Sequence, residues 1–378
     1  MQLFLDYSQP IAIRTKMVKM VHNITSPELL NMPFIDFTAI VKEAWLAYDN
    51  TRQIARIVDI SAKVSTNHVY RVTFVDGNFI IAKLSYFGDH DHFAEDHSII
   101  DTLSNNLPAP FENFLARSLA KGKSLFVYRF QSEILDAWVV FYRPIKIKRK
   151  VPKRLDDLQI AKLGEQVALF HKACDCIRHT LPSSSKTLQS DIDHLLRIVE
   201  TEEGRYEHRM HIDEIKRQAN LFTQNAAILN EDSLDKIPVF VDWNIGNFSV
   251  TSSFRLFSRW DYDWFRIGTR ALDFYFLSRV VSDAGDRTAF SYYVEPLMEK
   301  RFLLFLKAYH QIFPLKEAEI RFMKEAYRFF ILNYVIKDGR FFFHELFATK
   351  LQKEAFEIYL PSIEKQFDAD IILKALNI

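Results

Sequence analysis

The chain has 378 residues, of which 48% are hydrophobic, and its formal net charge at pH 7 is +1. This length suggests two domains or one large two-lobed unit, and a charge near zero excludes a strong overall attraction to nucleic acid. Two cysteines, Cys174 and Cys176, are too few for a disulfide framework, and no apolar run is long enough for a transmembrane helix. We therefore expect a cytoplasmic protein without a nucleic-acid or membrane partner, and composition leaves the oligomeric state open.

Residues 1–25 show no clear pattern, and helical patterns follow them. Ser26 is a suitable N-cap, because a proline and a glutamate follow it in what would be the first helical turn. From Asp36 to Tyr48 apolar residues recur at helical spacing. We expect residues 1–50 to form a helical extension that packs against the next part of the chain.

From Ile54 the periodicity changes to two, which predicts a small sheet. Asp76-Gly-Asn78 is typical of a hairpin turn, and a helix is expected at His92–Asn105. These patterns predict a small α+β lobe over residues 51–142. The expected strands are Ile54–Ile60, Val69–Val75, Phe79–Leu84, Phe114–Ala120, Ser124–Phe130 and Trp138–Tyr142.

The basic segment Lys146–Arg154 follows this lobe and suggests an exposed connector, although it could also attract an anionic substrate. Helical patterns then dominate residues 143–378, with a β-hairpin expected at 238–260. The order predicts an α+β chain with a small antiparallel-sheet lobe and a larger, mainly helical lobe. The expected helices are Leu155–Cys174, Ser190–Thr201, His211–Leu229, Ala271–Val281, Tyr293–Phe313, Lys316–Asp338 and Phe347–Phe367.

Three polar residues in and after the predicted hairpin stand among apolar neighbours: Asp242, Asn247 and Asp261. Two carboxylates and an amide that converge from a loop and a strand end can orient a hydroxyl group and hold Mg²⁺ through oxygen ligands. Asp263 is an alternative to Asp261, since it would point the same way on a strand. A polar turn between two core strands would explain the same residues without any chemistry.

Lys83 lies in an apolar strand, where it either reaches water from an edge or has a function. Glu95 follows on the next predicted helix. The order of a strand lysine, a helix glutamate, Asp-x-x-x-x-Asn and a later aspartate is that of protein kinases. The turn at Ser65, Thr66 and Asn67 takes the place of a glycine-rich loop and could donate hydrogen bonds to phosphate oxygens, or it could be a plain polar turn.

These pieces resemble the aminoglycoside phosphotransferase, choline kinase and homoserine kinase-like family. That family has the pattern His-Gly-Asp-Leu-His-Pro-Gly-Asn, then Ile-Asp-Trp/Phe, then Gly-Asp-Pro-x-x-Asp-Leu. The resemblance covers roughly residues 35 to 360 and implies a two-lobed protein-kinase-like fold. The segments that carry it are 240–247, 260–262 and 268–274, together with 93–103, 107–110 and 163–171.

The resemblance implies an enzyme that uses ATP and Mg²⁺ to phosphorylate a hydroxyl group of a small molecule. Asp242 would orient that hydroxyl and take its proton, and Asn247 and Asp261 would hold Mg²⁺. Lys83 would contact the α- and β-phosphates, and Glu95 would position Lys83. On the same basis, the turn at 65–67 would cover the phosphates.

Three further residues bear on the resemblance. Asp273 would brace the catalytic loop from behind, or be an ordinary acid at a helix start. Phe240 and Asn244 replace the two histidines of the family pattern. This replacement leaves two alternatives open beside a small-molecule kinase: a nucleotide-binding pseudokinase with a regulatory role, and a protein Ser/Thr kinase of the same fold.

The expected acceptor region, 190–230 and 270–345, mixes acids with aromatic residues. It lacks the concentration of acids expected for a polycationic aminoglycoside. It shows no concentrated aromatic cage for a quaternary ammonium either, although Tyr292, Tyr293 and Tyr334 leave that alternative open. We therefore expect a small neutral or zwitterionic acceptor, such as an amino alcohol, a hydroxy-amino acid or a sugar.

Overall fold

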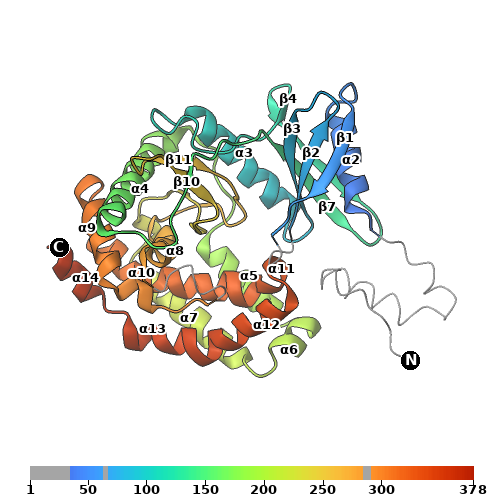
Figure 1. Cartoon of the computed structure of the whole chain (residues 1–378). Helices are drawn as coiled ribbons and strands as arrows, with labels where there is room; N and C mark the ends of the chain where they lie inside the picture. Colours follow the sequence, from blue (N-terminus) through green and yellow to red (C-terminus); the bar gives the residue numbers. More distant parts are fainter. Residues whose placement is uncertain (1–34, 63–66, 284–290) are drawn as a thin grey trace. The chain divides into compact units, whose positions relative to one another are not determined.

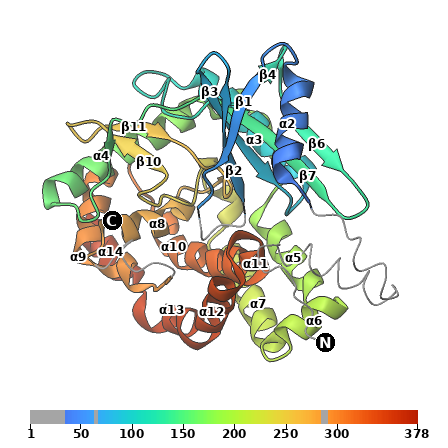
Figure 2. The same ribbon diagram turned by 45° about the vertical axis from the view of Figure 1, so that its right-hand side comes forward.

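The computed structural model describes residues 35–62, 67–283 and 291–378, which form two compact units (Figures 1 and 2). The sheet unit contains the described residues up to His97, Arg117–Pro144 and Gly339–Thr349. The helical unit contains Ser98–Ala116, Ile145–Asp338 and Lys350–Ile378. The expected α+β organisation is confirmed, since one unit is built on an antiparallel sheet and the other is mainly helical.

The main sheet of the sheet unit has five antiparallel strands in the order β1-β2-β3-β7-β6. The turn between β2 and β3 has Gly77 at φ 81°, a conformation that favours glycine, and this confirms the expected hairpin. The strands are β1 (Ile54–Asp59), β2 (His68–Phe74), β3 (Phe79–Ser85), β6 (Val127–Gln131) and β7 (Asp136–Tyr142).

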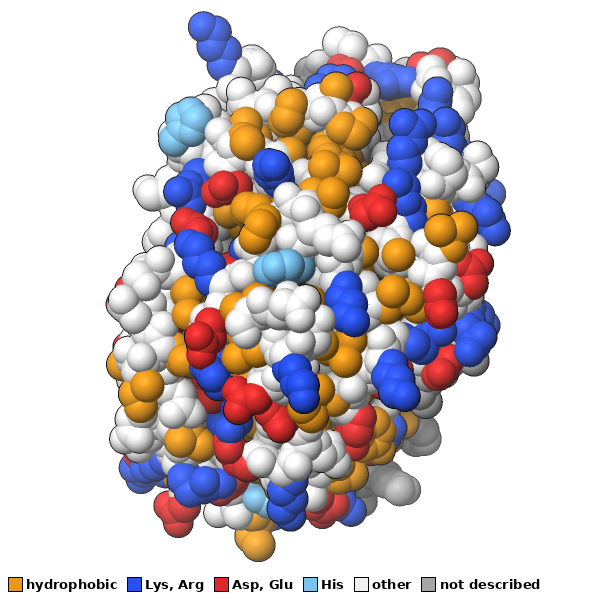
Figure 3. Space-filling model, turned by 90° about the vertical axis from the view of Figure 1, so that its left-hand side faces the viewer, with side chains coloured by type: hydrophobic (Ala, Val, Ile, Leu, Met, Phe, Trp, Pro, Cys, Tyr) orange, Lys and Arg blue, Asp and Glu red, His pale blue; other side chains and the backbone are white. Residues whose placement is uncertain are grey.

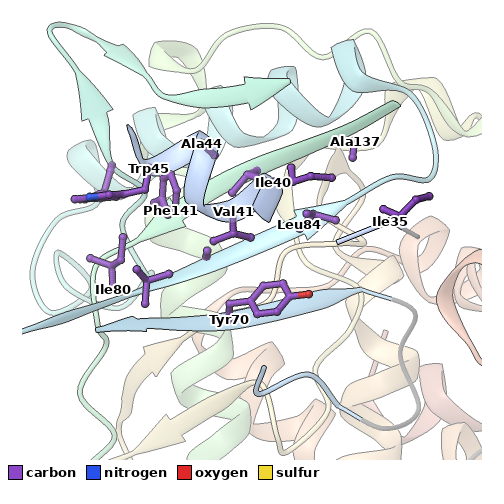
Figure 4. Close-up of a cluster of buried hydrophobic side chains, with 14 of the residues drawn as sticks. Ile35, Ile40, Val41, Ala44, Trp45, Tyr70, Ile80, Leu84, Ala137 and Phe141 are labelled. Carbon is purple, nitrogen blue, oxygen red and sulfur yellow. The ribbon is translucent and has the colours of Figure 1, made fainter. Parts of the chain in front are cut away.

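Helix α2 (Phe37–Tyr48) packs on this sheet, as the apolar spacing of the sequence predicts. The side chain of Asp36 caps the helix by accepting hydrogen bonds from two backbone N–H groups of the first turn. Figure 4 shows Trp45 beside Phe141 in the resulting core, where the ring centroids lie 5.4 Å apart. The helix expected to begin at Ser26 lies outside the described residues.

The pleat of β7 separates its side chains between two helices. Ala137, Val139 and Phe141 belong to the core beneath α2. Trp138 and Tyr142 point to the opposite face, because successive strand residues alternate. There they contact the first turns of α3 (His90–Asn106), through Phe93 at 5.8 Å from Trp138 and through the His97 Nε2 atom at 2.6 Å from the Tyr142 hydroxyl. Each helix therefore covers one face of the sheet.

The short helix α11 (Gly339–Phe342) also belongs to the sheet unit, although it comes late in the chain. Its Phe342 ring lies 5.0 Å from Phe87, which follows β3, and its Phe341 ring stacks on Phe87 at 6.3 Å. The segment Gly339–Thr349 is thus a late return of the chain to the sheet unit.

In the helical unit, α8 forms the centre, because every residue of Ala271–Val281 is buried. The expected bounds of this helix are confirmed. Two other helices, α4 and α9, approach each other closely at Gly164. The remaining helices are α4 (Asp157–Ile177), α5 (Leu188–Ile198), α6 (Glu202–His208), α7 (Ile212–Ile228), α9 (Lys300–Ile312), α10 (Glu317–Phe330), α12 (Glu345–Glu354), α13 (Leu360–Gln366) and α14 (Ala369–Leu376).

Three helices that the sequence predicts as continuous are interrupted. The one expected over 293–313 starts as a 3₁₀ turn at Glu295–Met298, is broken at the extended Glu299 and continues as α9. The helix expected over 316–338 changes after α10 into a π-helix, η6 (Ile331–Lys337), and the one expected over 347–367 contains a second, η7 (Ala355–Tyr359). A π-turn adds one residue per hydrogen-bonded ring and shifts the apolar face. All residues of η6 are buried, so periodicity gives no signal there.

The strands expected as one hairpin at 238–260 belong to two ladders, and only the second of these is a hairpin. β9 (Ile237–Val239) pairs with β12 (Arg266–Gly268), and β10 (Phe248–Val250) pairs with β11 (Leu256–Arg259). β10 also pairs with β8 (Arg149–Lys150), which lies inside the basic segment. The connector expected there is exposed, but it also contributes a strand. The sequence does not predict this strand, because period-two patterning does not identify the partner of a short strand.

The strand expected at Phe114–Ala120 is also different. Its first residues bond to the helical unit, since Arg259 N–H donates to the Phe114 carbonyl and Ala116 N–H donates to the Arg259 carbonyl. Ser118 forms an isolated antiparallel bridge with Tyr142 of β7, and Ala120–Lys121 (β4) pairs with β5 (Ser124–Leu125). Leu115 and Arg259 form an isolated parallel bridge that extends the sheet of β10 and β11.

The surface carries charges of both signs. Figure 3 shows one face on which acidic and basic side chains are interspersed, in agreement with the net charge of +1. Among the described residues, no helix combines the length and the apolar character needed to cross a membrane.

The contact of α4 with α9 generates a stability prediction. A Cβ atom at Gly164 would lie 2.4 Å from the Phe305 carbonyl oxygen, so Gly164→Ala forces the helices apart. We expect a lower free energy of unfolding, by about 1–3 kcal/mol, despite the higher helix propensity of alanine. Gly246→Ala is the matched control for denaturant unfolding, because a Cβ there meets nothing within 4 Å. Equal stability of the two variants would contradict the close approach.

Candidate active site

The loop 240–247 connects β9 to β10 and carries Asp242. It turns sharply, because Asp242 N–H donates to the Phe240 carbonyl at 2.6 Å and Trp243 N–H donates to the Val241 carbonyl at 3.0 Å. Val241 has φ 58°, which a β-branched residue rarely adopts. Such strain, on the order of 1–3 kcal/mol, persists only where surrounding contacts enforce it.

Asp273, in the first turn of α8, supplies those contacts. Its Oδ1 atom accepts hydrogen bonds from the backbone N–H groups of Phe240 at 2.9 Å and Val241 at 2.6 Å. Its Oδ2 atom lies 2.9 Å from His171 Nε2, and His171 Nδ1 lies 2.8 Å from the Tyr309 hydroxyl. The bracing position expected for Asp273 is confirmed, and the alternative of an ordinary helix-start acid is wrong.

The Asp242 carboxylate is oriented from within its own loop. Asn247 Nδ2 donates to its Oδ2 atom at 2.9 Å, and the Asn244 backbone N–H donates to its Oδ1 atom at 3.1 Å. Asp242 is half-buried, so the carboxylate is held in place without being shut off from solvent. Because Asn244 contributes its backbone, a change of its side chain leaves this contact intact.

The register of β10 with β11 brings the candidate metal ligands together. Phe248 lies opposite Arg259, and Trp260 N–H donates to the Asn247 carbonyl at 3.0 Å. Asp261 follows directly, exposed and at φ 67°. Asn247 and Asp261 thus stand at neighbouring strand ends, whereas Asp263 lies two residues further and is half-buried.

The donor set fits Mg²⁺. Mg²⁺ prefers oxygen ligands and is usually held by one or two side chains together with phosphate oxygens and water. Asp261 offers an exposed carboxylate. Since the Nδ2 atom of Asn247 is directed at Asp242, its Oδ1 atom faces away from that carboxylate and remains suited to a cation.

Arg259, which no sequence motif indicates, lies beneath this loop. Its side chain is fully buried, with the guanidinium carbon 4.5 Å from the ring centroids of both Phe240 and Trp243. Its Nη2 atom donates to the Asp242 carbonyl at 2.9 Å. Burial lowers the pKa of Arg259, while the carboxylates of Asp273 and Asp242 act against that change. The available signal was a charged residue in an otherwise uncharged strand.

In the sheet unit, Lys83 lies on a central strand. β3 has β2 and β7 as neighbours, with Val69 and Val140 directly opposite Lys83, and the lysine is only 6% exposed. The edge-strand alternative is therefore wrong. Residues paired across a sheet share a face, so Lys83 lies on the face covered by α3. Glu95 is carried by that helix.

Of the three residues expected to cover phosphates, Ser65 and Thr66 lie outside the described residues. Asn67 is buried, and its Oδ1 atom accepts a hydrogen bond from the Ser85 hydroxyl at 3.3 Å. This contact fixes the end of β2 beside the end of β3. The phosphate-covering role of the turn stays a prediction.

A second polar group lies in the helical unit, where Arg266 and Lys337 both bind Asp191, at 3.0 and 3.1 Å. Lys337 also lies 3.4 Å from Asp338, and Arg266 reaches the Tyr334 hydroxyl at 3.5 Å. Burial opposes ionisation of Asp191, but Arg266 and Lys337 hold its pKa below the ordinary value. Burial raises the pKa of Asp338 to about 6. We call these five residues the paired-charge cluster.

No protein-family model matches the chain, and no curated protein matches it by sequence. Solved structures do match. An amicoumacin kinase with AMP-PNP, Ca²⁺ and Ami has a TM-score of 0.60 at 13% identity, over 89% of this chain and 97% of that one. The chain has the fold of this kinase. The protein-kinase-like fold expected from the sequence is therefore confirmed.

Two further structures share this kinase fold. A microcompartment-associated aminopropanol kinase has a TM-score of 0.53 at 15% identity, over 86% of this chain and 98% of that one. The GDP and kanamycin complex of APH(2'')-IIia has a TM-score of 0.53 at 12% identity, over 86% and 99%. The kinase fold thus extends over nearly the whole length of each compared protein.

Substitution of Asp261 and of Asp263 tests which of these two neighbouring acids binds the metal. We expect Asp261→Asn to weaken Mg²⁺-dependent ATP binding by about 100-fold or more, because the exposed carboxylate loses its charge while the backbone is unchanged. Asp263→Asn is the matched control and should bind nearly as the wild type does. Isothermal titration with ATP at several Mg²⁺ concentrations measures both. Weaker ATP binding in Asp263→Asn alone would identify Asp263 as the metal ligand.

Lys83 and Glu95 are expected to act as one unit. Lys83→Ala should lower kcat/KM for ATP by about 100-fold or more and Glu95→Gln by less, since the glutamate acts only by placing the lysine. The double variant should then be no worse than Lys83→Ala alone. Steady-state kinetics of the three variants tests this, and additive losses would show that the two residues act separately.

Proposed function

We propose that the protein is an ATP- and Mg²⁺-dependent phosphotransferase that moves the γ-phosphate to a hydroxyl group of a small molecule. The observation that carries the proposal is the loop around Asp242. Its carboxylate is oriented by Asn247 and Asn244, and its strained backbone is anchored by the buried carboxylate of Asp273. The amicoumacin and aminopropanol kinases of the same fold support a small-molecule acceptor.

The proposed chemistry divides among these residues. Asp242 orients the acceptor hydroxyl and receives its proton as the oxygen attacks phosphorus in line with the leaving group. Asn247 and Asp261 hold Mg²⁺, which neutralises charge on the phosphate oxygens. Lys83 binds the α- and β-phosphates and is positioned by Glu95. Catalysis in such a site comes from positioning and electrostatic stabilisation, and no covalent intermediate is needed.

Phe240 does not leave a gap where the family pattern has a histidine. Its ring packs against Phe170, Trp243 and Phe265, at centroid distances of 5.9, 6.4 and 5.3 Å. Its backbone keeps the bond to Asp273. Packing thus supports the loop without the histidine, and this favours an active kinase over a pseudokinase.

The paired-charge cluster supports a narrower acceptor class. Arg266 lies on β12 directly opposite Val239, and the loop with Asp242 begins at the next residue. In the cluster the cations are buried, while the carboxylates of Asp191 and Asp338 keep 19% and 26% exposure. The accessible carboxylate oxygens can accept hydrogen bonds from an ammonium group, although the two buried cations already balance their charge. We therefore propose a small amino alcohol or hydroxy-amino acid as the acceptor.

The proposed location is the cytoplasm, where ATP is available. Both cysteines are free, with Cys174 buried and Cys176 exposed, which agrees with a reducing compartment. The proposed partners are the nucleotide and the acceptor, without nucleic acid or membrane.

An activity screen tests the proposal. ADP release is measured with ATP, Mg²⁺ and a panel of amino alcohols, hydroxy-amino acids, sugars and aminoglycosides, and phosphorylated products are identified by mass spectrometry. We expect turnover with a small amino compound, and a decrease in kcat of about 10²–10⁴-fold in Asp242→Asn, because the hydroxyl loses its proton acceptor.

Three other outcomes contradict the proposal in different ways. Equal background hydrolysis by the wild type and Asp242→Asn, together with tight nucleotide binding, would indicate a pseudokinase. Phosphate incorporation into an added protein would indicate a Ser/Thr kinase. Preference for kanamycin over every small amino compound would contradict the narrower acceptor class.

A further inference from the structure

Arg259 is a buried charge with few hydrogen bonds. Its side chain is 0% exposed, and of its five N–H donors those on Nε and Nη1 have no hydrogen-bond partner among the described residues. Burial of a guanidinium with incomplete hydrogen bonding costs several kcal/mol, on the order expected for a poorly compensated ion. A hydrophobic residue of similar length would fill the same space without that cost, so the geometry calls for a specific use of the charge.

The contacts of Arg259 converge on one point of the catalytic loop. The guanidinium lies 4.5 Å from the rings of Phe240 and Trp243, which flank Asp242 on either side in the sequence. Its single strong hydrogen bond goes to the carbonyl of Asp242 itself. Contacts between an arginine and an aromatic face are stronger when both groups are removed from water, as they are here. Three contacts therefore fix the peptide that carries the proposed proton acceptor.

The other end of Arg259 is equally fixed. Its backbone N–H donates to the Phe114 carbonyl at 2.6 Å, its carbonyl accepts from Ala116 at 2.9 Å, and it lies opposite Phe248 in the sheet. Asp261 follows two residues later on the same chain segment. A single residue thus joins the peptide of Asp242 to the strand that ends at the candidate metal ligand.

We propose that Arg259 is a positioning residue, which holds Asp242 in register with Asp261 through its hydrogen bond to the Asp242 carbonyl and its contacts with Phe240 and Trp243. This role rests on the proposed phosphotransferase function. Because Val241 holds a strained conformation, the peptide that follows it relaxes when the carbonyl loses its donor. A displacement of about 1 Å at a reacting group can cost about 100-fold in rate.

The test compares Arg259→Met with Arg259→Lys and with a matched control. Arg279→Met removes another buried arginine, which lies over Phe276 and Tyr292 at 5.2 and 4.8 Å in the last turn of α8. We expect Arg259→Met to lower kcat by about 10–100-fold, with KM for ATP changed by less than about threefold, because the nucleotide contacts remain. Arg259→Lys should recover part of kcat, since an ammonium can still contact the rings and the carbonyl.

A double-mutant cycle with Phe240→Leu tests the coupling. The decrease in kcat of Phe240→Leu/Arg259→Met should be smaller than the product of the decreases in the two single variants, because both substitutions remove the same contact. Multiplicative losses would overturn the proposed contact. A fall in melting temperature like that of Arg279→Met, with kcat unchanged, would make Arg259 purely structural and overturn the proposal.

Hydrogen exchange separates this inference from the proposed function. We expect faster amide exchange in the peptide that contains residues 240–247 in Arg259→Met, and wild-type exchange there in Arg279→Met. This readout needs no acceptor and no turnover. Unchanged protection of that peptide overturns the positioning role even if the wild type is an active kinase. Faster exchange supports that role even if the activity screen finds no acceptor.

Discussion

The structure of the catalytic loop depends on one buried carboxylate. Asp273 is fully buried, and it accepts two backbone hydrogen bonds from the strained peptides of Phe240 and Val241. Hydrogen bonds to a charged group contribute about 1.5–3 kcal/mol each, enough to offset the strain at Val241. The carboxylate is itself held by His171, so α4 and α8 together determine where the loop lies. The position of Asp242 is determined by that arrangement.

Buried charges of opposite sign surround the same loop. Arg259 lies on the β11 side of the loop and Asp273 on the α8 side. Each forms a hydrogen bond to the loop backbone. Among the described residues, no hydrogen bond joins their two side chains. A low-dielectric interior strengthens both interactions. The loop peptide is therefore held between a cation and an anion. This arrangement favours one conformation of the loop before any substrate binds, which is what positioning catalysis requires.

Much of this organisation could be predicted from sequence, for reasons that differ by residue. The Asp-Gly-Asn turn and the helix of Ala271–Val281 have local signals. Asp242, Asn247 and Asp261 stand out because polar residues interrupt apolar runs, whereas the role of Asp273 was implied by the family resemblance. The ladders of β8, β9 and β12 could not be predicted, since strands of two or three residues are too short to show a period. Arg259 was missed because its partners are aromatic rings and a carbonyl, which leave no pattern of spacing. The π-helix η6 was missed because it is buried on all sides.

The division of the chain between the units has a consequence for how the protein can be altered. The polypeptide passes from one unit to the other after His97, Ala116, Pro144, Asp338 and Thr349. No continuous fragment therefore contains one unit whole without also containing part of the other. A truncation beyond Asp338 removes the contacts of Phe341 and Phe342 with Phe87. Because the units are interleaved in this way, either of them can be removed or replaced only by cutting the chain at several points.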